Sequence, residues 1–249
     1  MIEISGLSFS YRKERVLDEV DLKIRAGEFV GIMGPVGSGK TTLLLTLNGI
    51  IPHMIKGNFE GEVKIFGRDT RETRVPQLAR DVGIVFQDPD SQIFSLKVRD
   101  EVAFGLENIG VPREETEARV REALRAVGLA ERINEDPNNL SGGQKQKLAL
   151  ACVLAMDQKI FALDEPVSNM EQRGAVEIYE ILRRANEKGK TVIVVEHDSE
   201  LLLEYADRII VLNEGKIALD AGARRALSNS VIAKLGLKVP CELKRKTKK

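Results

Sequence analysis

A glycine-rich turn between an apolar run and a helix-forming run is the feature that most limits what this chain can fold into. The run FVGIMG is typical of a buried strand, and KTTLLLTLNG is typical of a helix that ends at Gly49. Between them, GPVGSGKT fits the pattern G-x-x-x-x-G-K-[ST] at Gly34, Gly39, Lys40 and Thr41. Such a turn points several backbone N–H groups at one phosphate group, at the positive end of a helix. The motif predicts a nucleoside triphosphate site; the alternative is a glycine-rich turn that binds nothing.

Two side chains of this turn have specific expected roles. Lys40 can reach the β- and γ-phosphates, and the Thr41 hydroxyl can bind Mg²⁺. The residues expected to contact the nucleotide in this segment are Gly34, Pro35, Val36, Gly37, Ser38, Gly39, Lys40, Thr41 and Thr42.

The composition narrows the class of protein. Of 249 residues, 43% are hydrophobic, so the chain can bury a large core. The 38 basic and 38 acidic residues give a formal net charge of +0, which argues against a broad nucleic-acid-binding surface. Two cysteines are too few for a disulfide framework, and Cys152 lies in the apolar run LALACVLAM, so we expect a buried core thiol. That run is too short to cross a bilayer, which takes about 20 residues, and we expect no secretory signal.

The order of the predicted elements indicates an α/β fold. Buried strands alternate with helices, which implies a mainly parallel sheet covered on both faces, and antiparallel signals cluster near the two ends of the chain. Residues 88–155 are richer in helix and predict a helical subdomain inserted between sheet elements. Together with the glycine-rich motif, this order predicts a P-loop nucleotide-binding fold with an N-terminal antiparallel β subdomain. Residues 228–249 are expected to form a short helix and a basic tail.

An acidic pair follows a second buried strand. In IFALDEP, Asp164 and Glu165 stand at the carboxyl end of the strand, where ligands of open α/β sheets bind. Asp164 can hold Mg²⁺ through water, and Glu165 can polarise water for in-line attack on a phosphate. The alternative is a pair of solvated carboxylates.

A second glycine-rich turn, in NLSGGQKQKLALA, lacks the Lys-Thr pair. Ser141, Gly142 and Gly143 can offer a hydroxyl and backbone N–H groups at a helix start, an arrangement that favours anions. The alternative is that this turn only caps the following helix, an interpretation that leaves Gln144 unexplained.

Five segments in this order make the chain resemble the nucleotide-binding subunit of ATP-binding cassette (ABC) transporters: GPVGSGKTT, VFQDP, LSGGQ, ALDEP and VVEHD. The resemblance covers residues 1 to about 227 and implies an ATP hydrolase that uses ATP and Mg²⁺. It also implies that two subunits pack head to tail. In such a pair, the turn of one subunit (Ser141, Gly142, Gly143, Gln144) caps the γ-phosphate held by the other.

Three further roles are implied by the resemblance. Tyr11 matches the aromatic residue that stacks on adenine, although it could instead pack locally beside Phe9. Gln87 matches the glutamine that contacts Mg²⁺ and the attacking water, in a loop that faces the membrane partner. His197 matches the histidine that hydrogen-bonds the γ-phosphate; the alternative is a histidine with purely structural contacts.

One loop departs from the family pattern. Where the family usually has Ser-x-Leu-Asp at the subunit interface, this chain has SNME, from Ser168 to Glu171. Glu171 keeps the charge but reaches about one methylene further. We expect slower or differently coupled hydrolysis at the partner's site, or a preference for a non-identical sister subunit. Unchanged turnover and pairing in Glu171→Asp would contradict this hypothesis.

The stretch VFQDPDSQIFSLKVRDEVAFGLENIGVP resembles the energy-coupling factor branch, whose importers take up vitamins and transition-metal ions. The implied partners are a second ATPase, identical or homologous, a transmembrane coupling protein and a substrate-capturing membrane protein. The coupling groove would lie along residues 87–107, at the cytoplasmic face of the cell membrane. Alternatively, Ile93, Phe94 and Leu96 belong to the core of the helical lobe.

Other functional classes stay open at this point. They are a soluble non-transport ABC ATPase of translation or DNA maintenance, the cassette of another importer type, and a regulatory cassette that binds ATP with little hydrolysis. The C-terminal KVPCELKRKTKK could approach anionic headgroups or simply be solvated.

Overall fold

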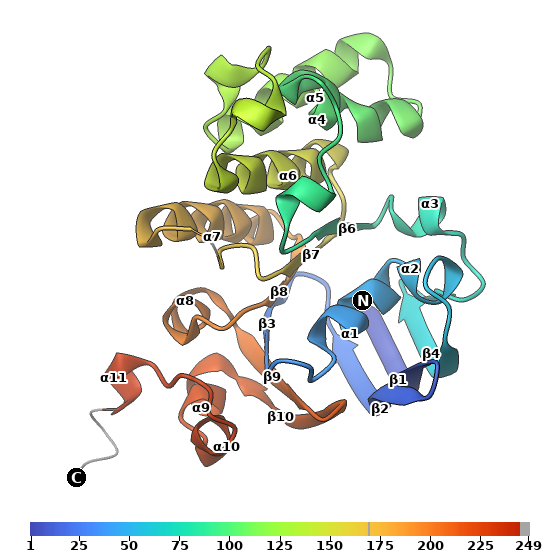
Figure 1. The fold of residues 1–249 in the computed structure, drawn as a ribbon, viewed down its shortest axis with the longest axis vertical. Helices are drawn as coiled ribbons and strands as arrows, with labels where there is room; N and C mark the ends of the chain where they lie inside the picture. Colours follow the sequence, from blue (N-terminus) through green and yellow to red (C-terminus); the bar gives the residue numbers. More distant parts are fainter. Residues whose placement is uncertain (169, 245–249) are drawn as a thin grey trace.

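A six-stranded sheet forms the centre of the molecule, in a computed structural model that describes residues 1–168 and 170–244 (Figure 1). The strand order is β10-β9-β3-β8-β7-β6. The strands are β3 (Phe29–Met33), β6 (Val82–Val85), β7 (Ile160–Asp164), β8 (Thr191–Val195), β9 (Arg208–Asn213) and β10 (Lys216–Gly222). All neighbouring pairs are parallel except β9 and β10. The predicted α/β fold with a mainly parallel sheet is therefore confirmed.

A second sheet, of four antiparallel strands, lies beside the first and confirms the predicted N-terminal β subdomain. Its order is β2-β1-β4-β5. The strands are β1 (Ile2–Tyr11), β2 (Glu14–Ile24), β4 (Asn58–Ile65) and β5 (Arg68–Asp69).

Side-chain alternation along the central strands divides the apolar interior into two cores. In β3, Phe29 and Met33 point into the larger core, which the helices cover. Val30 and Ile32 point into the other core, together with apolar residues of the antiparallel sheet and of α1 (Lys40–Leu47). Because α1 contacts β2, β4 and β7, the loop that precedes it is anchored between the two sheets.

Most of the helices between β6 and β7 gather at one end of the molecule in Figure 1. This region contains α4 (Val98–Asn108), α5 (Arg113–Ala126), α6 (Gly142–Met156) and three 3₁₀ turns, η1 (Pro89–Ser91), η2 (Ala130–Arg132) and η3 (Pro137–Asn139). The remaining helices are α2 (Ile50–His53), α3 (Val75–Leu78), α7 (Gln172–Glu187), α8 (Ser199–Tyr205), α9 (Ala223–Leu227), α10 (Ser230–Lys234) and α11 (Cys241–Lys244).

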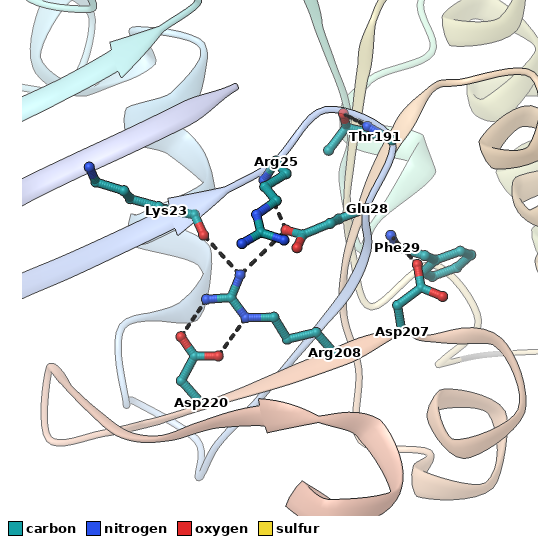
Figure 2. Close-up of polar contacts among 9 residues, drawn as sticks. Lys23, Arg25, Glu28, Phe29, Thr191, Asp207, Arg208 and Asp220 are labelled. Carbon is teal, nitrogen blue, oxygen red and sulfur yellow. Dashed lines mark hydrogen bonds and ion pairs between the residues drawn. The ribbon is translucent and has the colours of Figure 1, made fainter.

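Polar side chains join the two sheets at the edge where the parallel strands begin, here called the amino edge (Figure 2). Arg208, the first residue of β9, forms ion pairs with Asp220 on β10 and with Glu28 ahead of β3. It also donates to the backbone carbonyl of Lys23 on β2 at 2.9 Å. One guanidinium thus ties the antiparallel sheet to the central sheet.

The C-terminal segment differs from the single short helix that the sequence predicts. Two short helices, α10 and α11, follow residue 228. Gly236 has φ of +69°, which ends α10, and Pro240 stands directly before α11, where the missing N–H is tolerated. Most of the basic tail, residues 245–249, lies outside the described residues.

Two expectations from composition can be compared with the described residues. No helix among them combines the length and the apolar character needed to span a bilayer. Cys152 is half-buried against the larger core, and burial raises the pKa of its thiol. The expected place beside the core is confirmed, but the residue is half-buried rather than buried.

Candidate nucleotide site

Glycines are required in the loop after β3 because its backbone approaches other segments closely. Gly34 and Gly39 have φ of +156° and +100°. A Cβ on Gly34 would lie 2.1 Å from the Leu212 carbonyl oxygen, and one on Gly39 would lie 2.7 Å from the Val16 carbonyl oxygen. The loop therefore holds a conformation that no larger residue could adopt at these two positions.

Lys40, the first residue of α1, is only 7% exposed and bends back over the loop. Its Nζ donates to the carbonyl oxygens of Gly34 and Pro35, each at 2.9 Å. Burial lowers the pKa of this ammonium, while Glu165 and Asp164 raise it. The loop thus encloses a buried cation, which suits a multiply charged anion such as a triphosphate.

The predicted Mg²⁺ ligands lie next to each other. The Thr41 hydroxyl donates to Asp164 Oδ2 at 2.6 Å, across 123 residues of sequence. Asp164 ends β7 and is 6% exposed, and its burial raises the pKa of the carboxyl. Among the described residues, no group of three or more His, Cys, Asp or Glu side chains could hold a metal. A hydroxyl and one carboxylate fit Mg²⁺ that takes its other ligands from phosphates and water.

Glu165 stands at the centre of the predicted catalytic group. Its Oε1 lies 2.9 Å from His197 Nε2, and its Oε2 accepts a hydrogen bond from Gln87 Nε2 at 2.8 Å. The three residues follow β7, β8 and β6, so the parallel sheet brings them together at one edge. Glu165 also has φ of +45°, a strain of roughly 1–3 kcal/mol for a non-glycine residue. Gln87 and His197 hold both oxygens of a strained, centrally placed carboxylate.

Tyr11 lies at the rim of this site and makes the local contact proposed as the alternative to adenine stacking. Its ring packs edge-to-face on Phe9, with ring centroids 4.9 Å apart. Its hydroxyl is 3.2 Å from the Thr42 hydroxyl on α1. Tyr11 therefore stands beside the phosphate loop and is half-buried.

The second glycine-rich turn caps its own helix. Ser141 Oγ accepts a hydrogen bond from Gln144 N at 3.4 Å, and Gln144 Oε1 accepts one from Ser141 N at 2.9 Å. This reciprocal capping box explains why Gln144 follows the glycines, so the statement that a cap leaves Gln144 unexplained was wrong. Within the described part of the chain, no hydrogen bond joins this turn to loop 34–42.

The SNME loop leads from Glu165 to α7. Ser168 N donates to the Glu165 carbonyl oxygen at 3.3 Å, and Glu171 is the N-cap residue of α7, without a side-chain capping bond. Between them, the Met170 side chain lies against Gly143, where an added Cβ would be 3.2 Å from its terminal methyl group. The loop therefore contacts the turn 141–144 of its own chain. Asn169 lies outside the described residues.

The apolar residues after Gln87 divide between the two alternatives. Ile93 packs against the larger core, whereas Phe94 and Leu96 are 63% and 79% exposed. Phe104 on α4 is 46% exposed, and its ring packs edge-to-face with Phe94 at 4.7 Å between centroids. We call Phe94, Leu96 and Phe104 the exposed apolar surface.

One buried residue at the site was not predicted. Glu196 is 3% exposed and lies directly before His197. The only signal in the sequence is a carboxylate placed between the apolar run TVIVV and the histidine.

Comparisons with known proteins agree with this geometry. The family model described as ABC transporter matches residues 17–168. Candidate ABC transporter ATP-binding proteins of Pyrococcus abyssi and Pyrococcus horikoshii are each 46% identical over 98% of this chain, and over 89% and 87% of their own length.

Two solved structures share the fold at high coverage. CbiO1 of Clostridium perfringens, part of the ABC transporter complex CbiONQ, has a TM-score of 0.82 and 31% identity, over 99% of this chain and 98% of that one. The cassette MJ0796, as a post-hydrolysis dimer bound to ADP and phosphate, has a TM-score of 0.78 and 33% identity, over 90% of this chain and 99% of that one.

Proposed function

Because the chain belongs to the ABC transporter family of ATP-binding cassettes, we propose that it powers an importer of the energy-coupling factor type through separate membrane proteins. The chain is an ATP hydrolase that uses ATP with Mg²⁺. The observation that carries the import role is the exposed apolar surface, which closely follows Gln87 in the chain. The cargo would be a vitamin or a transition-metal ion.

The chemistry of the proposed site uses the residues at the carboxyl edge of the sheet. Lys40 and the amides of loop 34–42 bind the β- and γ-phosphates. Thr41 and Asp164 would hold Mg²⁺, which neutralises phosphate charge when bound. Glu165 orients and polarises the attacking water. Since His197 and Gln87 now hold both Glu165 oxygens, they must release Glu165 as they turn toward the γ-phosphate.

A second ATPase subunit, identical or homologous, completes the proposed site. The turn of Ser141, Gly142, Gly143 and Gln144 would cap the nucleotide of that partner. Its capping box already orders the start of α6, and an added Cβ on Gly142 would meet no atom within 4 Å. Val36 in the phosphate loop is 93% exposed, as a residue that meets a partner would be. The dimer of the similar cassette MJ0796 supports this arrangement.

The exposed apolar surface is the proposed docking site of the membrane partners. Two of its residues lie on a loop that side chains hold in place: Glu101 Oε2 accepts from Phe94 N and Ser95 N at 3.1 and 2.8 Å. Gln92 ties the same loop to Phe86, the residue before Gln87, by accepting from its N–H at 3.2 Å. A shift of Gln87 can therefore move the surface. In this role the chain is a peripheral protein at the cytoplasmic face of the membrane.

The experiment is to purify the protein from native membranes with its partners, as wild type and as the double variant Phe94→Ser/Leu96→Ser. We expect wild type to co-purify with integral membrane proteins and the variant to lose them, with unchanged ATP hydrolysis in the isolated cassette. Met54→Ser is the matched control, because Met54 is an exposed apolar residue, at 71%, outside this surface.

The outcome separates the candidate functions. Loss of membrane partners in the double variant alone supports the import role. If wild type co-purifies with no membrane protein, or the control behaves like the double variant, the docking site is wrong. A soluble ABC ATPase of another process then becomes the better assignment. The identity of a captured substrate-binding membrane protein also distinguishes an energy-coupling factor importer from another importer type.

A further inference from the structure

Glu196 uses its side chain to hold the turn that carries His197. It follows the last residue of β8, and its own N–H donates to the Ile32 carbonyl oxygen on β3 at 3.1 Å. The side chain then folds forward, so that Oε1 accepts from His197 N at 2.7 Å and from Asp198 N at 3.2 Å. One buried carboxylate oxygen therefore binds two successive amides of the turn.

A second carboxylate holds the chain on the other side of the histidine. Asp198 caps α8, with Oδ1 accepting from Glu200 N at 2.9 Å and from Leu201 N at 3.3 Å. The backbone is thus bound before and after His197. Its imidazole, at 2.9 Å from Glu165 Oε1, has a defined direction because the backbone that carries it is fixed on both sides.

The other carboxylate oxygen of Glu196 indicates that burying this side chain destabilises the fold. Glu196 Oε2 and the Tyr179 hydroxyl are both buried neighbours, and neither makes a hydrogen bond of normal geometry to any described residue. Burial raises the pKa of the Glu196 carboxyl, and the nearby Asp198 and Glu165 raise it further, against the two amide bonds. A buried, partly unsatisfied carboxylate destabilises a fold. Stability alone therefore does not account for a buried glutamate at this position.

We propose that Glu196 is a positioning residue for ATP hydrolysis, which holds the backbone of His197 in place for its proposed contact with the γ-phosphate by binding the amides of the turn. It touches neither nucleotide nor water in this role. The inference rests on the proposed part of His197 in the reaction. A displacement of a positioned group by about 1 Å can lower turnover by about a hundredfold, so the geometry of one turn is enough to matter.

The test compares Glu196→Ala with Glu196→Gln in steady-state ATP hydrolysis by the full chain. We expect Glu196→Ala to lower kcat by about tenfold to a hundredfold with KM for ATP within about twofold of wild type, because the phosphate loop is untouched. Glu196→Gln should stay within about threefold of wild type, because its amide oxygen still accepts both N–H groups. Glu196→Asp, which keeps the charge and shortens the reach, should resemble Glu196→Ala.

Asn186→Ala is the matched structural control. Asn186 is 9% exposed and its Nδ2 donates to the carbonyl oxygens of Gly27 and Lys190, at the opposite edge of the same sheet. The control should lose stability without losing kcat. If Glu196→Ala or Glu196→Asp lowers kcat no more than Asn186→Ala does, the inference is overturned.

A double-variant cycle with His197→Ala shows whether Glu196 acts through the histidine. We expect Glu196→Ala to lower kcat little further in the His197→Ala background. A full additional loss would overturn the inference while leaving the proposed role of His197 intact. If His197→Ala alone keeps normal kcat, the proposed catalytic role of His197 fails instead.

Discussion

Both edges of the central sheet carry charged and polar side chains, but these are well paired at one edge and only partly paired at the other. At the amino edge, Arg208 meets Asp220 and Glu28, and the Thr191 hydroxyl accepts from Gly27 N at 3.0 Å (Figure 2). Charges and donors there have matching partners. At the carboxyl edge, Asp164 and Glu165 lie near Lys40, and Glu196 lies near Glu165; burial raises the pKa of Asp164 and of Glu196.

This contrast shows that the fold tolerates backbone strain and buried charge at the carboxyl edge. Both edges terminate the same buried strands, so the requirement to satisfy backbone groups is the same. Among the residues that the structure describes, only the carboxyl edge combines a non-glycine residue in left-handed backbone, Glu165, with a buried cation, Lys40, whose pKa is lowered by burial. Incompletely paired groups such as Lys40 gain favourable contacts when a charged ligand binds. The groups at the amino edge are already paired, so a ligand would add few contacts there.

The largest effect is expected from a matched pair of Glu→Gln variants, one at each edge. Glu165→Gln should lower ATP turnover by about 10²- to 10⁴-fold while ATP binding remains, because the general base is lost and the phosphate loop is not. In the presence of ATP it should also elute as a dimer in size-exclusion chromatography. Glu28→Gln should leave turnover within about twofold. Normal hydrolysis by Glu165→Gln would show that another residue acts on the water.

A smaller effect on a different quantity is expected from Arg208→Met. Loss of the guanidinium removes ion pairs and a bond to the Lys23 carbonyl, so urea unfolding should show a loss of about 1–2 kcal/mol in free energy of unfolding. The folded fraction should hydrolyse ATP at the wild-type rate. A fall in kcat with unchanged stability would mean that the amino edge also serves the reaction.

The smallest effect is a pH dependence that belongs to Glu196. Its folded pKa is raised above the ordinary value of 4.5 by burial and by Asp198 and Glu165, while the amides of His197 and Asp198 lower it. Well below pH 4.5 the Glu196 carboxyl is protonated in both the folded and the unfolded chain, so its ionisation does not destabilise the folded protein. As pH rises toward the folded pKa, the folded state holds the proton more tightly than the unfolded state, and the cost of ionising the folded group grows until it is complete above that pKa.

Glu196→Gln should therefore be more stable than wild type at pH 8, with a gap that narrows as pH falls toward 5. Urea unfolding of both proteins across this range measures the gap, because titrating groups that do not interact with Glu196 contribute equally to both proteins. The Tyr179 hydroxyl, the remaining polar neighbour from α7, stays protonated throughout, because burial raises its pKa well above 10. A gap that is constant, or that widens at low pH, would mean that Glu196 is not the group responsible.

The sequence by itself determined the local units and which end of the strands is functional. An apolar run followed by glycines, Lys40 and Thr41 specifies strand, loop and helix within about a dozen residues, because each step depends only on near neighbours. Asp164 and His197 could be assigned to the same edge for the same reason: Asp164 directly follows an apolar run, and only Glu196 separates His197 from another. The helix cap at Ser141 and Gln144 was also readable from four adjacent residues, although its significance was missed.

Only the tertiary structure decided which side chains meet. The bond between Gln87 and Glu165 spans 78 residues and exists because β6 and β7 are neighbours in the sheet, an order that no local pattern encodes. Packing likewise turned Ile93 inward and left Phe94 and Leu96 exposed, although all three are apolar. The second oxygen of Glu196 became costly only because the folded chain buries it. Burial and pairing are properties of the assembled layers, so they appear only when distant segments are brought together.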